Sequence, residues 1–331
     1  MDSYQECAQE IGLPMDFYWV TRKGNKAKNI RVLEIAGSSY MVARYLQAKK
    51  LNELTREYHK VILRYPLFDP VLALFVRRKK KIILEHHTKE VEELKASKDV
   101  RYWTERYFGR WIRWFGGLLA VTPELLSYEK SRSSFGGPSM FFPNSILVGS
   151  CPPGKISVGR EVQMVMVSNF YPWHGVDLIL DELERADAEN LGYHFHFVGN
   201  LSNSDQDRVS RLNSVTYHGV LAKEDVGSLL ERMDVGVDSF NMAIKGMRQS
   251  TSLKMREYLK GGLLVVTGCE DPAFPPDFEY IAYMKEFDIS EIIKFVRKHE
   301  GKSRAVICER ARTYIDSRVV LKSLYRWVTS C

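Results

Sequence analysis

Long apolar runs are missing from this chain of 331 residues. No stretch of about 18 consecutive apolar residues occurs, so no segment is expected to cross a bilayer as a helix. The opening residues, MDSYQECAQEIGLPMDF, lack a charged start followed by an apolar stretch and therefore predict no secretory signal. Both absences favour a soluble globular protein of the cytoplasm.

Cysteine is scarce, and its positions form no metal or disulfide pattern. The five cysteines lie far apart, with neither a CxxC pair nor a histidine at metal-ligand spacing: Cys7, Cys151, Cys269, Cys308 and Cys331. This pattern favours reduced thiols with structural roles and does not predict a structural zinc site. Internal repeats and low-complexity segments are also lacking.

Apolar and basic residues, in contrast, are plentiful. Apolar residues make up 45% of the chain and aromatic residues 12%, which excludes a disordered or collagen-like protein. The length suits two domains of ~150 residues each. The formal net charge of +7 favours anionic partners, namely nucleotide phosphates, membrane head groups or nucleic acid, without choosing among them.

Strand-like and helix-like segments alternate along both halves of the chain. In the first half we expect strands at 16–23, 29–35, 60–66, 81–87 and 141–146. In the second half we expect five strands with their helices, from VQMVMVSN to GLLVVTG, the last helix being MRQSTSLKMREYLKGG. Such alternation predicts parallel strands joined by crossovers, and hence doubly wound α/β sheets.

A segment rich in glycine, proline and serine, residues 148–160, separates the two halves. We therefore expect an N-terminal domain at 1–150 and a second domain at 151–300. The helical end, 301–331, is expected to pack back toward the N-terminal domain. Because open α/β sheets bind ligands at the carboxyl ends of their strands, we expect a ligand in a cleft between the two domains.

The last helix of the second half begins with hydroxyl residues. Ser250, Thr251 and Ser252 can supply side-chain caps and free backbone N–H groups, where the helix dipole favours an anion by ~1–2 kcal/mol. Glu257 lies within one turn of Lys254 and can accept hydrogen bonds from the hydroxyls of a nucleotide sugar. The alternative is an ordinary capped helix with solvated charges.

The order of four segments decides between these alternatives. VSNFYPWHGVDLIL, YHFHFVGN, VTYHGVLAKEDVGSLLERMDVGVDSF and STSLKMREYLKGGLLVVTG resemble, over residues 160–270, the donor-binding lobe of family 4 retaining glycosyltransferases of the polysaccharide-assembly type. The resemblance implies the GT-B fold, in which two Rossmann-like, doubly wound domains face a central cleft. It also implies transfer from a nucleotide-diphosphate sugar without a metal cofactor.

The resemblance assigns roles to particular residues. Glu257 would bind the nucleotide ribose, and the segment from Ser252 to Tyr258 would hold the diphosphate through backbone N–H groups and Lys254. The catalytic set is then His87, Gln249 and Glu257. The donor-binding set is Asn169, His174, Gly219, Arg248, Ser252, Leu253, Lys254 and Glu257.

Two departures from the family pattern alter these roles. Gln249 stands where the family has a carboxylate, and its amide can still read sugar hydroxyls as donor and acceptor. Ser168-Asn169-Phe170 and His174-Gly175 replace the family's G-R-L-x-x-x-K-G, which removes both cations that grip the diphosphate. The hypothesis is that Lys245, Arg248, Lys254 or a protonated His174 supplies the missing charge.

The first half resembles the acceptor lobe of the same family more weakly. IILEHHTKEVEEL is similar to the strand that ends in Glu-x-His, which would put His87 beside the sugar, with His86 as the second candidate. From the residues alone, both histidines could equally serve a surface or capping role. The resemblance also leaves Thr122 and Asn144 near the cleft. In place of the family's first strand the sequence predicts a helix, YQECAQEIG, which implies an abbreviated N-terminal lobe.

Residues 101–117, RYWTERYFGRWIRWFGG, are basic and rich in aromatic rings. Trp103, Tyr107, Trp111 and Trp114 follow helical spacing, so one face could enter a membrane surface while arginines meet acidic head groups. The alternative is an aromatic helix packed on the N-terminal sheet. The run RRKKK at 77–81 adds positive charge on the same domain. No base-reading motif accompanies the charge, so nucleic acid is not an expected partner.

The sequence therefore predicts a hexosyltransferase-like enzyme that moves a sugar from a UDP- or GDP-sugar to a glycan or lipid-linked glycan. We expect it in the cytoplasm, peripheral to the inner membrane face. The alternatives are a catalytically inactive nucleotide-sugar or glycan-binding subunit, and another GT-B nucleotide-sugar enzyme such as an epimerase. A metal-dependent transferase would use a D-x-D motif, which Asp205-Gln206-Asp207 matches only within a polar helix start.

Overall fold

The computed structural model describes residues 2–21, 31–34, 40–76, 80–157, 159, 161–189 and 191–330. The chain forms two compact units, Met1–Pro143 with Ser317–Cys331, and Asn144–Asp316. Each unit holds its own parallel sheet. The division lies close to the one expected from the glycine-rich and proline-rich segment, but it differs in two places.

Residues 144–150 belong to the second unit, whereas the sequence placed them in the first domain. The side-chain amide of Asn144 donates to the carbonyl of Thr251 at 2.8 Å, and the N–H of Ile146 donates to the carbonyl of Ile315 at 2.9 Å. The helix α12 (Arg304–Ile315) also lies in the second unit. Only α13 (Ser317–Ser330) belongs to the first unit, where it packs against α1 (Asp2–Glu10).

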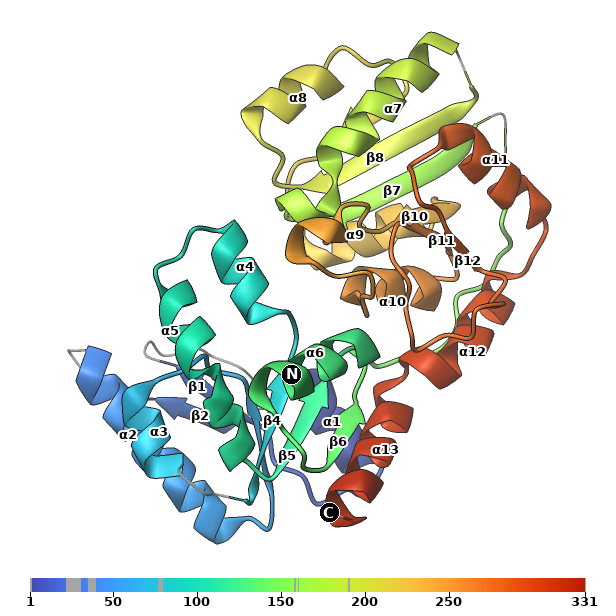
Figure 1. Ribbon diagram of the computed structural model, residues 1–331. Helices are drawn as coiled ribbons and strands as arrows, with labels where there is room; N and C mark the ends of the chain where they lie inside the picture. Colours follow the sequence, from blue (N-terminus) through green and yellow to red (C-terminus); the bar gives the residue numbers. More distant parts are fainter. Residues whose placement is uncertain are drawn as a thin grey trace. The chain divides into compact units, whose positions relative to one another are not determined.

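The first unit contains a four-stranded parallel sheet in the order β3-β4-β5-β6 (Figure 1). Its strands are β3 (Val61–Arg64), β4 (Ile82–His86), β5 (Gly117–Ala120) and β6 (Ser139–Phe141). The strand expected at 141–146 is therefore wrong in position. The ladder ends when Phe142 donates its N–H to Ala120, because Pro143 has no N–H to continue it.

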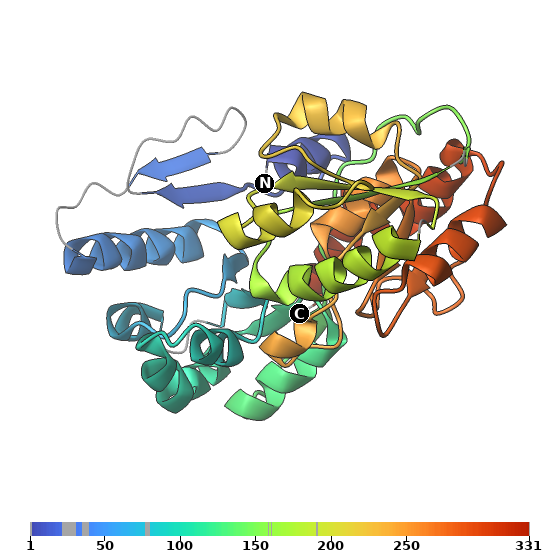
Figure 2. The same ribbon diagram turned by 90° about the horizontal axis from the view of Figure 1, so that it is seen from above.

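A separate two-stranded parallel sheet precedes the main sheet of this unit, as Figure 2 shows. Its strands are β1 (Tyr18–Thr21) and β2 (Arg31–Glu34). They lie inside the two segments where strands were expected. In those two segments, residues 22, 23, 29, 30 and 35 lie outside the described residues.

The first unit contains further helices besides α1 and α13. They are α2 (Tyr40–Glu57), α3 (Pro70–Val76), α4 (Glu90–Ala96), α5 (Arg101–Phe108), the 3-10 helix η1 (Gly109–Trp114) and α6 (Pro123–Ser133). Trp111, Ile112 and Phe115 pack on Ile82 and Leu118 to form the core. The expected basic run at 77–81 is described only for its last two lysines.

The second unit contains a six-stranded parallel sheet in the order β12-β11-β10-β7-β8-β9. The strands are β7 (Val162–Ser168), β8 (Tyr193–Gly199), β9 (Val215–Tyr217), β10 (Val235–Val237), β11 (Leu264–Thr267) and β12 (Ile281–Tyr283). Five were expected; the short β12 was missed. Strand order reverses between β7 and β10, the switch point of a doubly wound sheet.

Helices cover both faces of this sheet (Figure 1). α7 (Val176–Glu189) and α8 (Asn203–Val209) lie on one side, and α9 (Lys223–Leu230) and α10 (Leu253–Lys260) lie on the other. Two 3-10 turns, η2 (Pro172–His174) and η3 (Met242–Lys245), and the helix α11 (Ile289–Lys298) complete the unit. The helical end expected at 301–331 consists of two separate helices, α12 and α13.

One close contact fixes α10 against the middle of the sheet. The ring of Tyr258 lies directly over Gly236 in β10, where even a Cβ atom would overlap it. The hydroxyl of Tyr258 accepts the N–H of Val167 in β7 at 2.9 Å. This pair holds α10 against β7 and β10.

Two of the cysteines are joined, although they were expected to be reduced. Cys151 and Cys308 form a disulfide with a Cα–Cα distance of 5.7 Å, within the normal range. They are 157 residues apart in the sequence, so the pairing depends on α12 packing beside the segment that follows residue 150. Cys7 and Cys269 are buried, and Cys269 is a free thiol. Cys331 lies outside the described residues.

Candidate functional site

The start of α10 in the second unit differs from the capped helix that the sequence predicts. Ser252 is the N-cap residue, with φ −63° and ψ 133°, yet its side chain makes no capping hydrogen bond to the helix. Its hydroxyl donates instead to Oδ1 of Asp238 at 3.0 Å. The first-turn N–H groups of a helix have no intrahelical partner, so these groups are not taken up by Ser252 and suit an anion.

Asp238, which the sequence analysis did not select, organises this site. It follows β10 directly and is fully buried. Its Oδ1 lies 3.1 Å from the ammonium of Lys254, while its Oδ2 has no hydrogen-bond partner among the described residues. Lys254 therefore already has a counter-charge. The available signal was an aspartate directly after the short apolar strand VGV.

The predicted catalytic pair of the second unit occupies two different local structures. Glu257 lies on α10 with its side chain 48% exposed and its carboxylate 3.5 Å from Lys260. Gln249 lies outside the helix, because α10 begins at Leu253 and not at 247. Gln249 instead pairs with Glu270 in an isolated parallel β-bridge, in which the N–H of Glu270 donates to the carbonyl of Arg248 at 3.1 Å.

The loop after β7 reaches the same region. The carbonyl of His174 accepts the N–H of Phe240 at 3.1 Å, which joins η2 to the end of β10. His174 is buried, and its Nδ1 lies 2.9 Å from the hydroxyl of Ser168. Burial, with the positive charge of Lys254, lowers the pKa of His174 to about 3. His174 is neutral at neutral pH, so the hypothesis that it supplies a positive charge is wrong.

The other predicted donor contacts surround this loop. Asn169 is exposed, directly after β7. The ammonium of Lys245 lies 3.5 Å from the ring centre of Trp173, a cation–π contact that holds η3 against η2. Leu253 and Arg248 are exposed at the start of α10 and in the segment before it.

Two glycines shape the ends of β8 and β9. Gly199 has φ 131° and donates its N–H to the carbonyl of Gly219 at 2.8 Å. Gly219 has φ 67° and no heavy atom near the place of a Cβ. Both conformations favour glycine. Because Gly219 follows β9, it lies at the carboxyl edge of the sheet, like Ser168 and Asp238.

In the first unit, the two adjacent histidines have different surroundings. His87 follows β4 with a side chain 25% exposed, and its Nε2 lies 3.1 Å from Glu85. It lines a cavity of about 280 Å³ together with Arg64, Tyr65, Thr88 and Glu90. His86 is fully buried and stacks on Tyr65 with ring centres 4.1 Å apart. His87 can therefore meet a sugar in this cavity, whereas His86 does not line it.

Two further predicted positions have structural partners. The hydroxyl of Thr122 accepts the N–H of Leu125 and caps α6. Asn144 binds the backbone at Thr251, next to the start of α10. The motif Asp205-Gln206-Asp207 opens α8, and Ser202 caps that helix at Asp205. One different group could hold a metal ion among the residues that are described: His86, Glu90 and Glu129.

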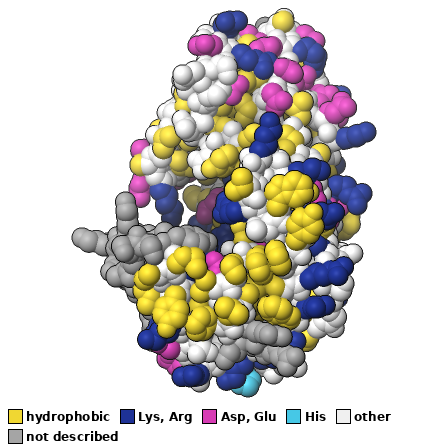
Figure 3. All heavy atoms as spheres, turned by 60° about the vertical axis from the view of Figure 1, so that its left-hand side comes forward, with side chains coloured by type: hydrophobic (Ala, Val, Ile, Leu, Met, Phe, Trp, Pro, Cys, Tyr) yellow, Lys and Arg dark blue, Asp and Glu magenta, His cyan; other side chains and the backbone are white. Residues whose placement is uncertain are grey.

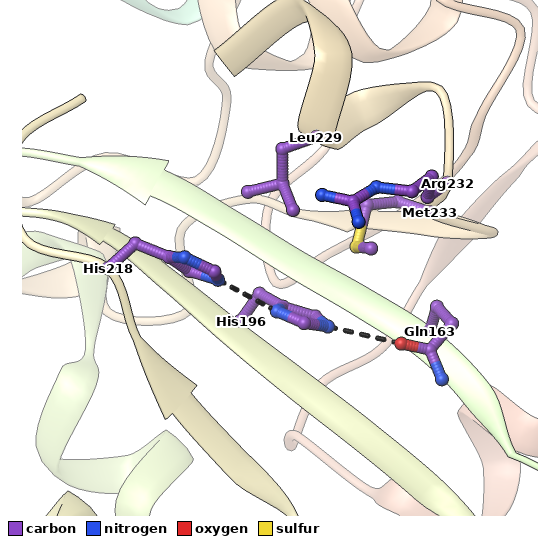
Figure 4. Close-up of a pocket in the computed structure, with 6 residues that line it drawn as sticks. All are labelled: Gln163, His196, His218, Leu229, Arg232 and Met233. Atoms are coloured by element: carbon purple, nitrogen blue, oxygen red, sulfur yellow. Dashed lines mark hydrogen bonds between the residues drawn. The ribbon is translucent and has the colours of Figure 1, made fainter. Parts of the chain in front are cut away.

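A second cavity of about 280 Å³ lies in the second unit, between the sheet and the end of α9. Figure 4 shows Gln163, His196 and His218 in a row along the sheet, with Arg232 opposite. His196 bonds to both neighbours, at 3.1 Å and 2.9 Å. Burial lowers the pKa of His196 to about 4. Gln163 lies at the amino end of β7, away from the strand ends where α/β sheets bind ligands.

The aromatic residues of 101–117 divide into two sets. Trp111 is buried in the core, and Trp114 packs against it, as the alternative reading expected. Three rings of α5 face solvent, with exposed fractions of 60% for Trp103, 70% for Tyr107 and 54% for Phe108. Figure 3 shows hydrophobic side chains gathered on this face of the unit. No helix in the described ranges is apolar over enough of its length to cross a membrane.

Comparison with known proteins shows the fold. No protein-family model and no curated protein sequence matches the chain. Among solved structures, a lipopolysaccharide outer core galactosyltransferase, WaaB, matches with a TM-score of 0.65 and 12% identity, covering 100% of this chain and 97% of its own. Sucrose-phosphate synthase from Thermosynechococcus elongatus matches with a TM-score of 0.66 and 14% identity, covering 99% and 92%.

A third solved structure carries ligands. HepE from Anabaena, in complex with UDP and glucose, matches with a TM-score of 0.59 and 14% identity, covering 99% of this chain and 96% of its own. At these identities the likeness concerns the fold. Together with the two parallel sheets, it confirms the predicted GT-B architecture of the glycosyltransferases.

Proposed function

We propose that this protein is a retaining glycosyltransferase of the family 4 type that moves a hexose from a UDP- or GDP-sugar to a glycan or lipid-linked glycan. The observation that carries the proposal is the start of α10. There a helix terminus without a side-chain cap at Ser252, the ammonium of Lys254 and the exposed carboxylate of Glu257 lie within two turns.

The chemistry of a nucleotide diphosphate suits each of these groups. The first-turn N–H groups of α10 and the helix dipole attract the diphosphate. Lys254 adds a cation whose position Asp238 fixes in advance, which favours stabilising the negative charge that develops on the departing diphosphate. Glu257 accepts hydrogen bonds from the ribose hydroxyls. No metal ion is needed in this scheme.

The comparisons support the substrate class. The structure of HepE was determined with UDP and glucose, and WaaB is named as a galactosyltransferase. The same likeness and the sequence resemblance over residues 160–270 support the proposal of transfer to a glycan in polysaccharide biosynthesis. In this scheme Gln249 contacts the transferred sugar through its amide, and His87 is the contact from the first unit.

Glu257→Ala is expected to weaken UDP or GDP binding by at least ~10-fold, because charged hydrogen bonds to the ribose contribute roughly 1.5–3 kcal/mol each. Titration calorimetry with UDP and GDP measures the loss. Glu291→Ala is the matched control, since Glu291 is also exposed and also pairs with a lysine three residues on. Equal affinity in the Glu257 variant and the wild type would exclude this site.

A catalytically inactive binding subunit would keep the nucleotide affinity without turnover. Incubation with a panel of UDP- and GDP-sugars, followed by detection of released nucleotide or free sugar, distinguishes the two functions. Hydrolysis or transfer that is lost in Glu257→Ala supports the enzyme. Binding without any turnover supports the inactive subunit, and interconversion of the donor sugar would indicate an epimerase.

The exposed rings of α5 support membrane association and hence a lipid-linked acceptor. Trp103 and Tyr107 stack with centres 6.3 Å apart, and Arg106, Arg110 and Arg113 are exposed around them. Rings with an apolar body and a polar edge, flanked by cations, suit the head-group region of an anionic leaflet. The protein would then act at the inner membrane face.

Replacement of Trp103 and Tyr107 by serine is expected to remove most binding to vesicles that contain anionic lipid. Both side chains are more than half exposed, so the loss reflects the surface and not the fold. Flotation of vesicles with and without anionic lipid measures it. Val220→Ser, at an exposed position of the second unit, should leave flotation unchanged. Flotation that is equal in all three proteins would contradict the membrane proposal.

A further inference from the structure

A buried group of one imidazole and two carboxylates lies in the first unit, where three elements meet. His86 ends β4, Glu90 begins α4, and Glu129 lies on α6. Nδ1 of His86 is 3.3 Å from Oε2 of Glu90 and 3.9 Å from Oε1 of Glu129. One possible ligand atom from each residue lies within 4.8 Å of the other two.

The group is not satisfied by its own contacts. Oε1 of Glu129 and Nε2 of His86 are buried and make no hydrogen bond to any residue that the structure describes. Both side chains have an exposed fraction of 0%. Leaving a buried carboxylate oxygen without a partner is costly. At 3.9 Å, Oε1 is too far from the imidazole for a hydrogen bond but is directed at it.

The charges around the group do not balance either. Arg132 binds Glu105 at 2.9 Å and Oε2 of Glu129 at 2.6 Å. The carboxylates of Glu90, Glu105 and Glu129 outnumber this one guanidinium. Excess charge of one sign in a protein interior is expensive. A divalent cation would offset the excess of negative charge.

We propose that His86, Glu90 and Glu129 bind one divalent transition-metal ion, zinc being the best fit, between β4, α4 and α6. Zinc takes imidazole nitrogen and carboxylate oxygen at about 2.0–2.2 Å, which places tetrahedral ligand atoms about 3.4 Å apart. The separations of 3.3 Å and 3.9 Å from the imidazole, with the two carboxylate oxygens within 4.8 Å of each other, require the carboxylates to move inward to bind the ion.

Neighbouring side chains already orient two of these ligands. Arg132 holds the second oxygen of Glu129, and the ring of Tyr65 stacks on His86. The hydroxyl of Tyr65 is itself held by the hydrogen bond of 2.5 Å that it donates to the carboxylate of Glu105. Such outer contacts set the direction of metal ligands and raise metal affinity.

The cavity beside His87 gives the ion a route to the group. Glu90 lines this cavity and has a side chain 11% exposed, whereas the other two ligands are fully buried. Thr88 lines the same cavity and has a buried hydroxyl without a partner in the described part of the chain. Water from the cavity can complete a four-coordinate shell.

The ion would be structural, since it joins three elements of the first unit. The inference does not depend on the proposed transferase activity, whose site residues on α10 lie in the second unit. This metal site differs from the sequence-based expectation, which was a protein that binds no metal ion. The sequence did not suggest it, because His86 was considered as a sugar contact or a surface or capping residue, and Glu129 is 43 residues away.

The test uses the full chain after removal of metal with a chelator. Titration calorimetry with ZnCl2 should show one tight site, and crystals grown with zinc should give an anomalous peak between His86, Glu90 and Glu129. Thermal unfolding should shift to higher temperature with zinc, because a ligand that binds the folded state stabilises it. Absence of the peak from crystals soaked with excess zinc would overturn the proposal.

Variants separate this site from adventitious binding. Glu90→Gln, which leaves both pairs of Arg132 intact, and Glu129→Gln should each lower zinc affinity by at least ~10-fold. Glu92→Gln removes the same charge from α4 and should have no effect. His218→Ala removes one of two close imidazoles, His196 and His218, that could bind zinc elsewhere. This variant should also leave the zinc affinity unchanged. Affinity lost only in His218→Ala would overturn the proposal.

Discussion

Arg256→Met is expected to lower the free energy of unfolding of the second unit by about 3–5 kcal/mol. The guanidinium of Arg256 is fully buried and lies 2.6 Å from Asp271. It also donates to the carbonyls of Asn144 and Ser252. Methionine fills a similar volume but leaves the carboxylate of Asp271 buried without its counter-charge. Urea unfolding followed by circular dichroism measures the change.

A second substitution shows whether charge is the cause. In Arg256→Met/Asp271→Asn both charges are removed, so the double variant should be more stable than Arg256→Met alone. Arg310→Met is the control, because Arg310 pairs with Glu279 at the surface and should cost less than about 1 kcal/mol. A double variant less stable than Arg256→Met would assign the loss to packing and not to the buried charge.

Gly199→Ala is expected to destabilise the same unit by at least about 3 kcal/mol, through two effects that add. A φ of 131° belongs to a region that only glycine enters at low cost, and strain there is of order 1–3 kcal/mol. The added Cβ would also overlap the carbonyl oxygen of Ser168 in the neighbouring strand. Backbone atoms cannot move aside as a flexible side chain can, so the two strand ends must separate.

Gly219→Ala provides the matched comparison for this effect. Gly219 also has a positive φ, of 67°, but no heavy atom lies near the place of its Cβ. Its substitution should cost only the left-handed backbone penalty of about 1–2 kcal/mol. Urea unfolding of the two variants side by side measures the difference. Equal losses in both would mean that the overlap with Ser168 is relieved without cost.

The doubly wound sheets could be predicted from the sequence because their main signals are local, whereas the GT-B fold was implied by the family resemblance. Each of the five expected strands of the second unit is an apolar run bounded by polar or glycine residues, and each forms. The short strand β12, Ile281–Tyr283, was missed because three residues carry too little periodicity to recognise. The strand at 141–146 was misplaced because the aromatic pair Phe141-Phe142 outweighed Pro143 as a signal.

The candidate site was predicted only in part, because its decisive contacts are long-range. A helix that carries Lys254 and Glu257 follows from the local pattern, although it begins at Leu253 and not at residue 247. That Ser252 turns away from the helix, and that Lys254 is paired, depend on Asp238, which lies 14 residues earlier than Ser252. His174 looked like a possible cation until burial made it neutral. The roles assigned to His87, Gln249 and the donor contacts stay predictions.

The disulfide and the buried histidine show the same limit. Cys151 and Cys308 carry no spacing that marks a pair, and only the packing of α12 brings them together. His86 and His87 are neighbours in the sequence, but successive residues of an extended chain point to opposite sides. One is therefore buried against Tyr65, and the other lines the cavity.

The contact between Gly236 and Tyr258 also constrains how the sequence of this protein can vary. Because a Cβ at 236 would overlap the ring, any residue larger than glycine there requires a smaller side chain in place of Tyr258. That exchange would also remove the hydroxyl that binds Val167. The two positions should therefore covary among homologues, and a glycine in a buried strand followed 22 residues later by tyrosine is a mark by which distant relatives can be recognised.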